Sequence, residues 1–175
     1  REESRLESLK NITERYDGYG NSIRKVMEHK DQERGLLGVV ADIIKVEKAY
    51  EVAVETALGG SIQNIVTDSE ETAKRMIAFL KKNRFGRATF LPLTSVSSGQ
   101  KFTKPEALKE QGVIGLASTL VKVEEKYRGI ADHLLGRTIV VDTIDHGIAI
   151  ARKYHQSLRL VTTEGELLSP GGSMT

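Results

Sequence analysis

Glu47, Glu51 and Glu55 recur every four residues, a spacing that places three carboxylates on one face of a helix. Clustered carboxylates are candidates for general acid–base chemistry. Val46, Tyr50 and Val54 recur with the same spacing, so the glutamates fit the solvated face of an amphipathic helix. We therefore interpret the three glutamates as surface residues rather than as catalytic groups.

Other catalytic motifs are missing from the sequence. The four histidines, His29, His133, His146 and His155, show neither HExxH nor His-x-His spacing, so no zinc site is predicted. No glycine precedes Lys-Ser or Lys-Thr, as a Walker A loop requires, and no G-x-S-x-G elbow occurs. The chain also has no cysteine, which excludes disulfides and fits a reducing cytosol. We expect no enzyme activity, no cofactor and no metal.

Positive charge is concentrated in one block of the chain. Residues 72–105 carry eight bases and no acid, whereas residues 35–71 carry seven acids and two bases. In a chain of net charge +2, such a segment is a candidate surface for a polyanion; a solvated helix face is the alternative. The eight bases are Lys74, Arg75, Lys81, Lys82, Arg84, Arg87, Lys101 and Lys104.

Two glycine pairs, Gly59-Gly60 and Gly171-Gly172, leave the backbone uncovered by side chains. Two backbones can approach closely at such places, which suits an interface between edge strands, and simple turn geometry is the alternative. Gly59-Gly60 follows a predicted helix, whereas phosphate-binding glycine loops precede one. A nucleotide loop is therefore the weaker interpretation of this pair.

The chain repeats itself. Two similar strings of residues occur in the sequence. The same number of residues separates Val46 from Val123 and Leu58 from Leu135, which are equivalent positions in these strings. The offset is slightly shorter between the aspartates at positions 68 and 142, so the second copy lacks a few residues near its glycine. Two copies in one chain predict two similar subdomains related by a pseudo-twofold axis.

Hydrophobic periodicity predicts the elements of each copy. In the first copy we expect a strand at 36–46, a helix from Val46 to the glycine stop at Gly59, and a strand at 62–67. Thr67 and Glu70 match a capping box for a helix that ends near residue 83, and a strand follows at 87–91. The second copy repeats this order and ends with a strand at 158–162, a turn at 163–166 and a short strand near 167–168.

The predicted fold class is mixed α/β (α+β), with two pseudo-symmetric sheet-plus-helix subdomains and an N-terminal helical coiled-coil stub. Leu6, Leu9, Thr13 and Tyr16 have the 3-4-3 spacing of a short coiled coil. The predicted boundaries are 1–34 for the coiled-coil end and lead-in helix, 35–93 for subdomain I, 94–112 for the connector and 113–175 for subdomain II.

Composition is that of a soluble globular chain: 175 residues, 39% hydrophobic and 29% charged. No apolar run reaches the roughly 20 residues that cross a membrane, and no signal peptide begins the chain. The start at Arg1 indicates a fragment of a longer protein.

Four strings resemble the hinge domain of bacterial SMC (structural maintenance of chromosomes) proteins, and they occur in the family's order. They are Leu58 to Val66, Phe79 to Leu93, Leu134 to Thr138 and Gly171 to Thr175. The resemblance implies two pseudo-symmetric subdomains flanked by two halves of a long antiparallel coiled coil. The family pattern continues into a second glycine pair and a returning helix, both of which lie beyond Thr175.

The resemblance also implies a homodimer in which each first half pairs with the second half of its partner through strand edges. The interface residues carried over are Gly59, Gly60, Gly86, Gly136, Gly171 and Gly172. Weak, sequence-independent DNA binding is implied for Lys81, Lys82, Arg84 and Arg87.

The function that follows is a dimerisation module joining two coiled-coil arms of a chromosome condensation and segregation ATPase. The implied location is cytoplasmic and nucleoid-associated, and the implied further partners of the full-length protein are ATP and accessory condensin subunits. The alternatives are a nucleotide- or small-ligand-binding α/β domain and a protein–protein module without a DNA role. A salt-titrated DNA mobility shift separates the last from the first.

Overall fold

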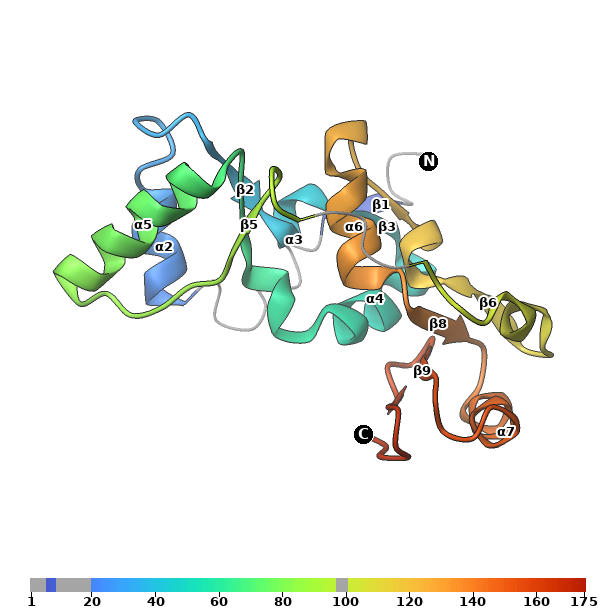
Figure 1. Ribbon diagram of the computed structural model, residues 1–175. Helices are drawn as coiled ribbons and strands as arrows, with labels where there is room; N and C mark the ends of the chain where they lie inside the picture. Colours follow the sequence, from blue (N-terminus) through green and yellow to red (C-terminus); the bar gives the residue numbers. More distant parts are fainter. Residues whose placement is uncertain (1–5, 9–19, 97–100) are drawn as a thin grey trace.

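The computed structural model describes residues 6–8, 20–96 and 101–175 and confirms the predicted mixed α/β fold (Figure 1). Helix α2 (Asn21–Met27) lies beside α5 (Glu70–Asn83) at one end of the molecule, and α7 (Ile144–Lys153) lies at the other end (Figure 1). Helices α4 (Glu51–Leu58) and α6 (Arg128–Leu135) pack against each other between these ends.

The first half builds a three-stranded sheet in the order β2-β4-β5. Strand β2 (Leu36–Val39) runs antiparallel to β4 (Ile65–Thr67), and β4 runs parallel to β5 (Phe90–Pro92). Between β2 and β4 the chain forms a short helix α3 (Val40–Ile43), strand β3 (Lys45–Glu47), the 3-10 turn η2 (Lys48–Tyr50), α4 and the 3-10 turn η3 (Gly59–Gln63).

The second half builds a four-stranded sheet in the order β10-β9-β8-β6. Strand β6 (Val113–Leu116) is antiparallel to β8 (Thr138–Val141), β8 is parallel to β9 (Arg159–Thr162), and β9 is antiparallel to β10 (Leu167–Leu168). The intervening elements are η5 (Ala117–Leu120), β7 (Val121–Lys122), η6 (Glu125–Tyr127), α6 and α7; the 3-10 turn η4 (Pro105–Lys109) precedes β6.

The two halves share their element order and their pattern of strand pairing. Each first strand is antiparallel to the third and carries a bulge at a glycine, Gly38 in β2 and Gly115 in β6. The offset between these glycines is the one that separates Val46 from Val123, and both have a positive φ, 149° and 157°. Strands β3 and β7 of the two halves pair with each other directly. The arrangement is consistent with the internal repeat predicted from the sequence.

Apolar side chains from both halves form one continuous core. Its fully buried members include Ile44 and Ile65 from the first half and Ile130 and Leu135 from the second. A smaller cluster around Ile139 fills the space between α7 and the second sheet. Because side chains of both halves bury one another, the halves hold each other in place.

Helix α5 begins two residues later than the capping box predicted. Its N-cap is Ser69, whose hydroxyl accepts a hydrogen bond from the backbone N–H of Thr72 at 3.4 Å. Thr67 is fully buried in β4 and donates its hydroxyl to the carbonyl of Ser69 at 2.9 Å. The predicted Thr67–Glu70 capping box is therefore wrong, whereas the predicted helix end near residue 83 is confirmed.

Further expectations differ from the structure. The helix expected from Val46 begins only at Glu51, because residues 45–47 form β3, and Glu51 is buried rather than part of a solvated face. The strand expected at 36–46 is interrupted by α3, where the backbone N–H of Ile44 donates to the carbonyl of Val40 at 3.1 Å. Leu6–Ser8 form strand β1, antiparallel to β3, where coiled-coil spacing predicted a helix. The remaining coiled-coil positions at 9, 13 and 16 lie outside the described residues.

Candidate dimer interface and nucleic-acid surface

The four bases predicted to contact DNA gather at the C-terminal end of α5. Lys81 and Lys82 lie in its last turn, Arg84 caps it, and Arg87 follows in the loop before β5. All four residues are exposed, and none forms an ion pair with another described residue. Cations at a helix C-terminus also interact favourably with the partial negative charge of its carbonyl groups.

Arg84 has a left-handed backbone, with φ 56° and ψ 42°. Its N–H donates to the carbonyl groups of Leu80 and Lys81, as the residue that ends a helix commonly does. Glycine is the usual residue at such a position because a Cβ is strained there. An arginine at this place therefore has a small conformational cost.

Helix α2 extends the basic surface in a way that sequence reasoning missed. The Lys25 ammonium lies 5.1 Å from the centre of the Phe85 ring, and the ring of Phe79 meets Phe85 edge-on at 5.7 Å. The hydroxyl of Ser22 donates to the carbonyl of Arg87 at 2.7 Å. The lead-in helix predicted within residues 1–34 was the available signal, but the sequence does not show which side of α5 this helix covers.

The acid-free block does not form one surface. Arg75 donates two hydrogen bonds to the carboxylate of Glu33, at 2.9 and 3.0 Å, and these bonds lower the pKa of Glu33. Lys101 and Lys104 lie in the segment before η4 and line a cavity away from the end of α5. Only part of the block is therefore available as a continuous basic patch beside α5.

Gly59 and Gly60 follow α4 and are exposed. Gly59 has a positive φ of 54°, which explains this glycine by backbone conformation. Gly60 has no positive φ, and a Cβ at either residue would meet nothing within 4 Å. Gly60 and Arg87 also line one open hollow of about 410 Å³, so the structure brings a predicted interface residue and a predicted DNA residue together.

Gly86 and Gly136 have reasons inside the chain to be glycine. Gly86 has φ 100°, and a Cβ there would lie 3.7 Å from the Cβ of Ser22. A Cβ at Gly136 would overlap the backbone oxygen of Asp132 in α6. Their glycine identity therefore gives no separate support for a role at an interface.

Gly171 and Gly172 form the turn of a small hairpin, with φ 93° and 104°. The segment after them folds back on β10, where Leu168 bridges to Met174 and the backbones of Leu167 and Thr175 exchange hydrogen bonds of 2.9 and 3.1 Å. The outer edge of β10 is thus covered by residues 173–175. Residues 173–175 therefore form the exposed edge on this side of the sheet.

The described residues hold no group of three or more histidine, cysteine or acidic side chains able to bind a metal ion. His146 pairs with Asp142 through Nδ1 and Oδ1 at 2.7 Å, which lowers the pKa of Asp142. None of the helices in the described ranges has the length and apolar content needed to cross a bilayer.

Comparison with known proteins identifies the class to which this fold belongs. The family "SMC proteins Flexible Hinge Domain" matches residues 33–151. The chain is 42% identical over 177 residues to the chromosome partition protein Smc of Lactiplantibacillus plantarum, covering 100% of this chain and 15% of that protein. The chain therefore belongs to the SMC hinge family, and it spans about 15% of the length of this curated relative.

Solved structures agree with this assignment. An asymmetric dimer of the Geobacillus stearothermophilus SMC hinge domain matches with a TM-score of 0.84 and 38% identity, covering 95% of this chain and 69% of that one. A Pyrococcus furiosus Smc hinge domain with an extended coiled coil matches with a TM-score of 0.70 and 30% identity, covering 88% and 55%.

Proposed function

We propose that the chain is a homodimerisation hinge, in which the first subdomain of each copy contacts the second subdomain of its partner. Gly60 carries this proposal, because neither its backbone conformation nor any neighbouring atom in its own chain requires a glycine there. An exposed position without a side chain lets another backbone approach closely. The solved hinge domain of Geobacillus stearothermophilus is an asymmetric dimer, which supports association of two copies.

The second contact surface is the hairpin that turns at Gly171 and Gly172. Its terminal segment, residues 173–175, is exposed. A partner strand that pairs here would continue the order β10-β9-β8-β6 outward. Gly59, Gly60, Gly171 and Gly172 are the residues we assign to the interface; Gly86 and Gly136 are assigned to its neighbourhood.

Sedimentation equilibrium tests the association. We expect a dimer at micromolar concentration, because two contacts close in one dimer and the second closure is intramolecular. A stable interface of this kind buries on the order of 1,200–2,000 Å² in total. A monomer at all concentrations up to about tenfold higher would contradict the proposal.

The same hinge is proposed to bind DNA weakly and without sequence preference through Lys81, Lys82, Arg84 and Arg87. The exposure of these four bases and their lack of acidic partners among the described residues support this assignment. Counterion release by about four phosphate contacts predicts that log K falls with log salt with a slope of about −3 to −4.

In the full-length protein we propose that the hinge joins two coiled-coil arms of an ATPase that acts in chromosome partition. The relatives' name, chromosome partition protein, and the extended coiled coil of the Pyrococcus furiosus hinge support this role. ATP, accessory condensin subunits and a nucleoid-associated cytoplasmic location belong to that proposal, with the ATP chemistry placed outside this chain.

A further inference from the structure

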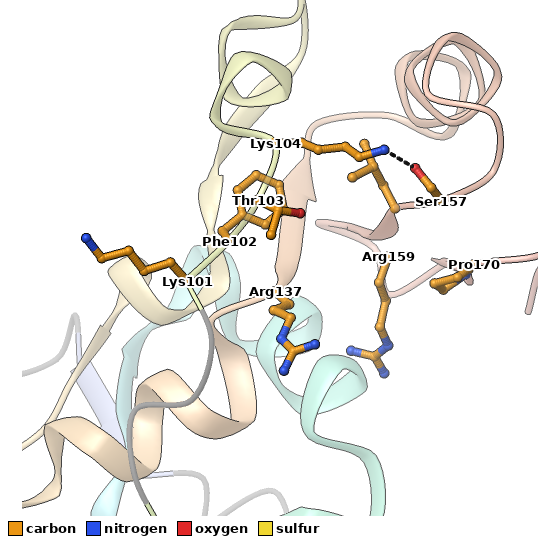
Figure 2. A pocket seen from close by; sticks show the side chains of 9 residues that line it. Lys101, Phe102, Thr103, Lys104, Arg137, Ser157, Arg159 and Pro170 are labelled. Atoms are coloured by element: carbon orange, nitrogen blue, oxygen red, sulfur yellow. Dashed lines mark hydrogen bonds between the residues drawn. The ribbon is translucent and has the colours of Figure 1, made fainter.

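A basic cavity of about 370 Å³ lies at the beginning of β8 and β9, and no residue of α5 lines it. Figure 2 shows the side chains around it. Arg137 directly precedes β8, and Arg159 is the first residue of β9. Because these strands are parallel neighbours in the register Thr138 to Arg159, the two arginines come together although β8 and α7 separate them in the sequence. Figure 2 shows their side chains extending in the same direction.

The wall of this cavity contains four cations and no acid. Two come from the segment before η4, Lys101 and Lys104, and two are the arginines just described. None of the four forms an ion pair within the part of the chain that the structure describes. Concave basic walls without carboxylates concentrate the positive potential and attract anions.

Arg159 is the anchor of this arrangement. Its Nη1 donates to the carbonyl of Ala57 at 3.1 Å and to the hydroxyl of Thr138 at 2.7 Å. These two neutral acceptors fix the guanidinium without neutralising it, and burial lowers its pKa from the ordinary value. A half-buried, oriented and uncompensated guanidinium is suited to an oxyanion, which it can meet with two parallel N–H groups.

The opposite wall is also ordered. Lys104 donates from Nζ to the hydroxyl of Ser157 at 3.0 Å, and this hydroxyl donates to the carbonyl of Tyr154 at 2.6 Å. Phe102, Leu158 and Pro170 add apolar surface between the charged groups. The volume exceeds that of a single tetrahedral anion and lies within the range of small-ligand sites.

We propose that this cavity is a binding site for a phosphate group, held by Arg137, Arg159, Lys101 and Lys104. A phosphate carries more charge than a single carboxylate and offers oxygens in several directions, which matches cations that approach from two strands and one loop. The phosphate belongs either to a free phosphate compound or to a DNA backbone. The site is separate from the DNA surface proposed at the end of α5.

Isothermal titration calorimetry of pyrophosphate at constant ionic strength tests this site. The variant Arg137→Gln/Lys104→Gln removes two cations from the cavity. It leaves Arg159 unchanged, because the hydrogen bonds of that residue to Ala57 and Thr138 also hold the fold together. We expect binding at least about tenfold weaker in this variant, the loss that follows from removing hydrogen bonds to a charged group. The matched control Lys109→Gln/Arg152→Gln removes two exposed cations outside the cavity and should keep the wild-type affinity.

A single-stranded oligonucleotide of thymidines distinguishes the two sources. Displacement of pyrophosphate from the wild type by the oligonucleotide assigns the site to backbone phosphates, and lack of displacement assigns it to a free phosphate compound. The variant Lys81→Glu/Lys82→Glu should leave pyrophosphate binding unchanged. A failure of the DNA surface proposed at the end of α5 can therefore be distinguished from a failure of this site. The site is refuted if pyrophosphate does not bind the wild type, or if it binds the double variant as tightly as the wild type.

Discussion

Lys45 and Lys122 lie directly opposite each other in the antiparallel pair of β3 and β7. Their separation along the chain equals the offset of the internal repeat, so a pseudo-twofold axis that relates the halves would pass between these two lysines. Both residues are exposed, and like charges that face each other across a strand pair are destabilising.

Replacing one of the two lysines should therefore stabilise the fold. We expect Lys45→Glu to raise the free energy of unfolding by about 0.2–1 kcal/mol, because a repulsive pair becomes an attractive one. Urea unfolding measures the change, and Lys48→Glu controls for the reversal of an exposed charge nearby. An increase that persists undiminished in 1 M salt would mean that the gain is not electrostatic.

Charge reversal at the end of α5 should weaken DNA binding without unfolding the domain. We expect Lys81→Glu/Lys82→Glu to bind DNA more weakly and to show a salt slope shallower by about two, because two phosphate contacts are lost. The matched variant Lys48→Glu/Lys74→Glu changes the net charge equally at exposed lysines outside the assigned four. Equal binding by the two variants in a mobility-shift titration would defeat the assignment.

Replacement of Arg84 should change stability and DNA binding in opposite directions. Because its φ is 56°, Arg84→Gly should raise the free energy of unfolding by roughly 0.5–1 kcal/mol. The same variant lacks one of the four bases and should bind DNA more weakly. Thermal unfolding and a DNA titration of the same sample check both changes; a loss of stability would show that the side chain has a structural role.

Acid should destabilise the fold through paired carboxylates. Hydrogen bonds from Arg75, His146 and Lys153 lower the pKa values of Glu33, Asp142 and Glu110 respectively. A lowered folded-state pKa stabilises the protein above the unfolded value, and this contribution is lost as pH falls toward the folded value.

The free energy of unfolding should therefore decline as the pH falls below about 4.5, the ordinary range of these carboxyl groups. Denaturant unfolding between pH 7 and pH 3 measures this decline. The variant Glu33→Gln/Glu110→Gln lacks two of the three carboxyl groups and should show a shallower decline. A decline as steep as that of the wild type would place the acid sensitivity elsewhere.

The sequence predicts those features that depend on local pattern. Helix α5 follows the apolar spacing of its residues, and its end near residue 83 agrees because charged residues and the glycine at 86 interrupt that spacing. The N-cap was misplaced because Thr67 and Ser69 are both suitable residues. Only the pairing of β4 with its neighbours shows that Thr67 is buried in a strand.

Features that depend on distant residues were beyond the sequence. Residues 40–43 continue the apolar run of the preceding strand, yet the pairing of β2 with β4 ends at Val39 and α3 begins at the next residue. Arg137 and Arg159 share one cavity only because β8 and β9 are parallel and in register. The sequence does not show whether a glycine is required by its own chain. Contacts within the folded chain show that Gly136 is required by α6 and that Gly60 is not.

The cross-pairing of subdomains can be tested by mixing two defective variants. Gly60→Val should damage the surface of subdomain I, and Gly172→Asn that of subdomain II; asparagine tolerates the positive φ at this residue comparatively well. In a homodimer of either variant, both contacts contain one damaged surface. In a mixed dimer, one contact contains both damaged surfaces and the other is intact.

The most direct measurement is therefore sedimentation equilibrium of each variant alone and of their equimolar mixture, with circular dichroism confirming that both are folded. We expect monomers for each variant alone and dimers in the mixture, weaker than those of the wild type because only one contact remains. If the mixture stays as monomeric as its components, or if each variant alone dimerises like the wild type, the subdomains do not pair across two copies at these glycines.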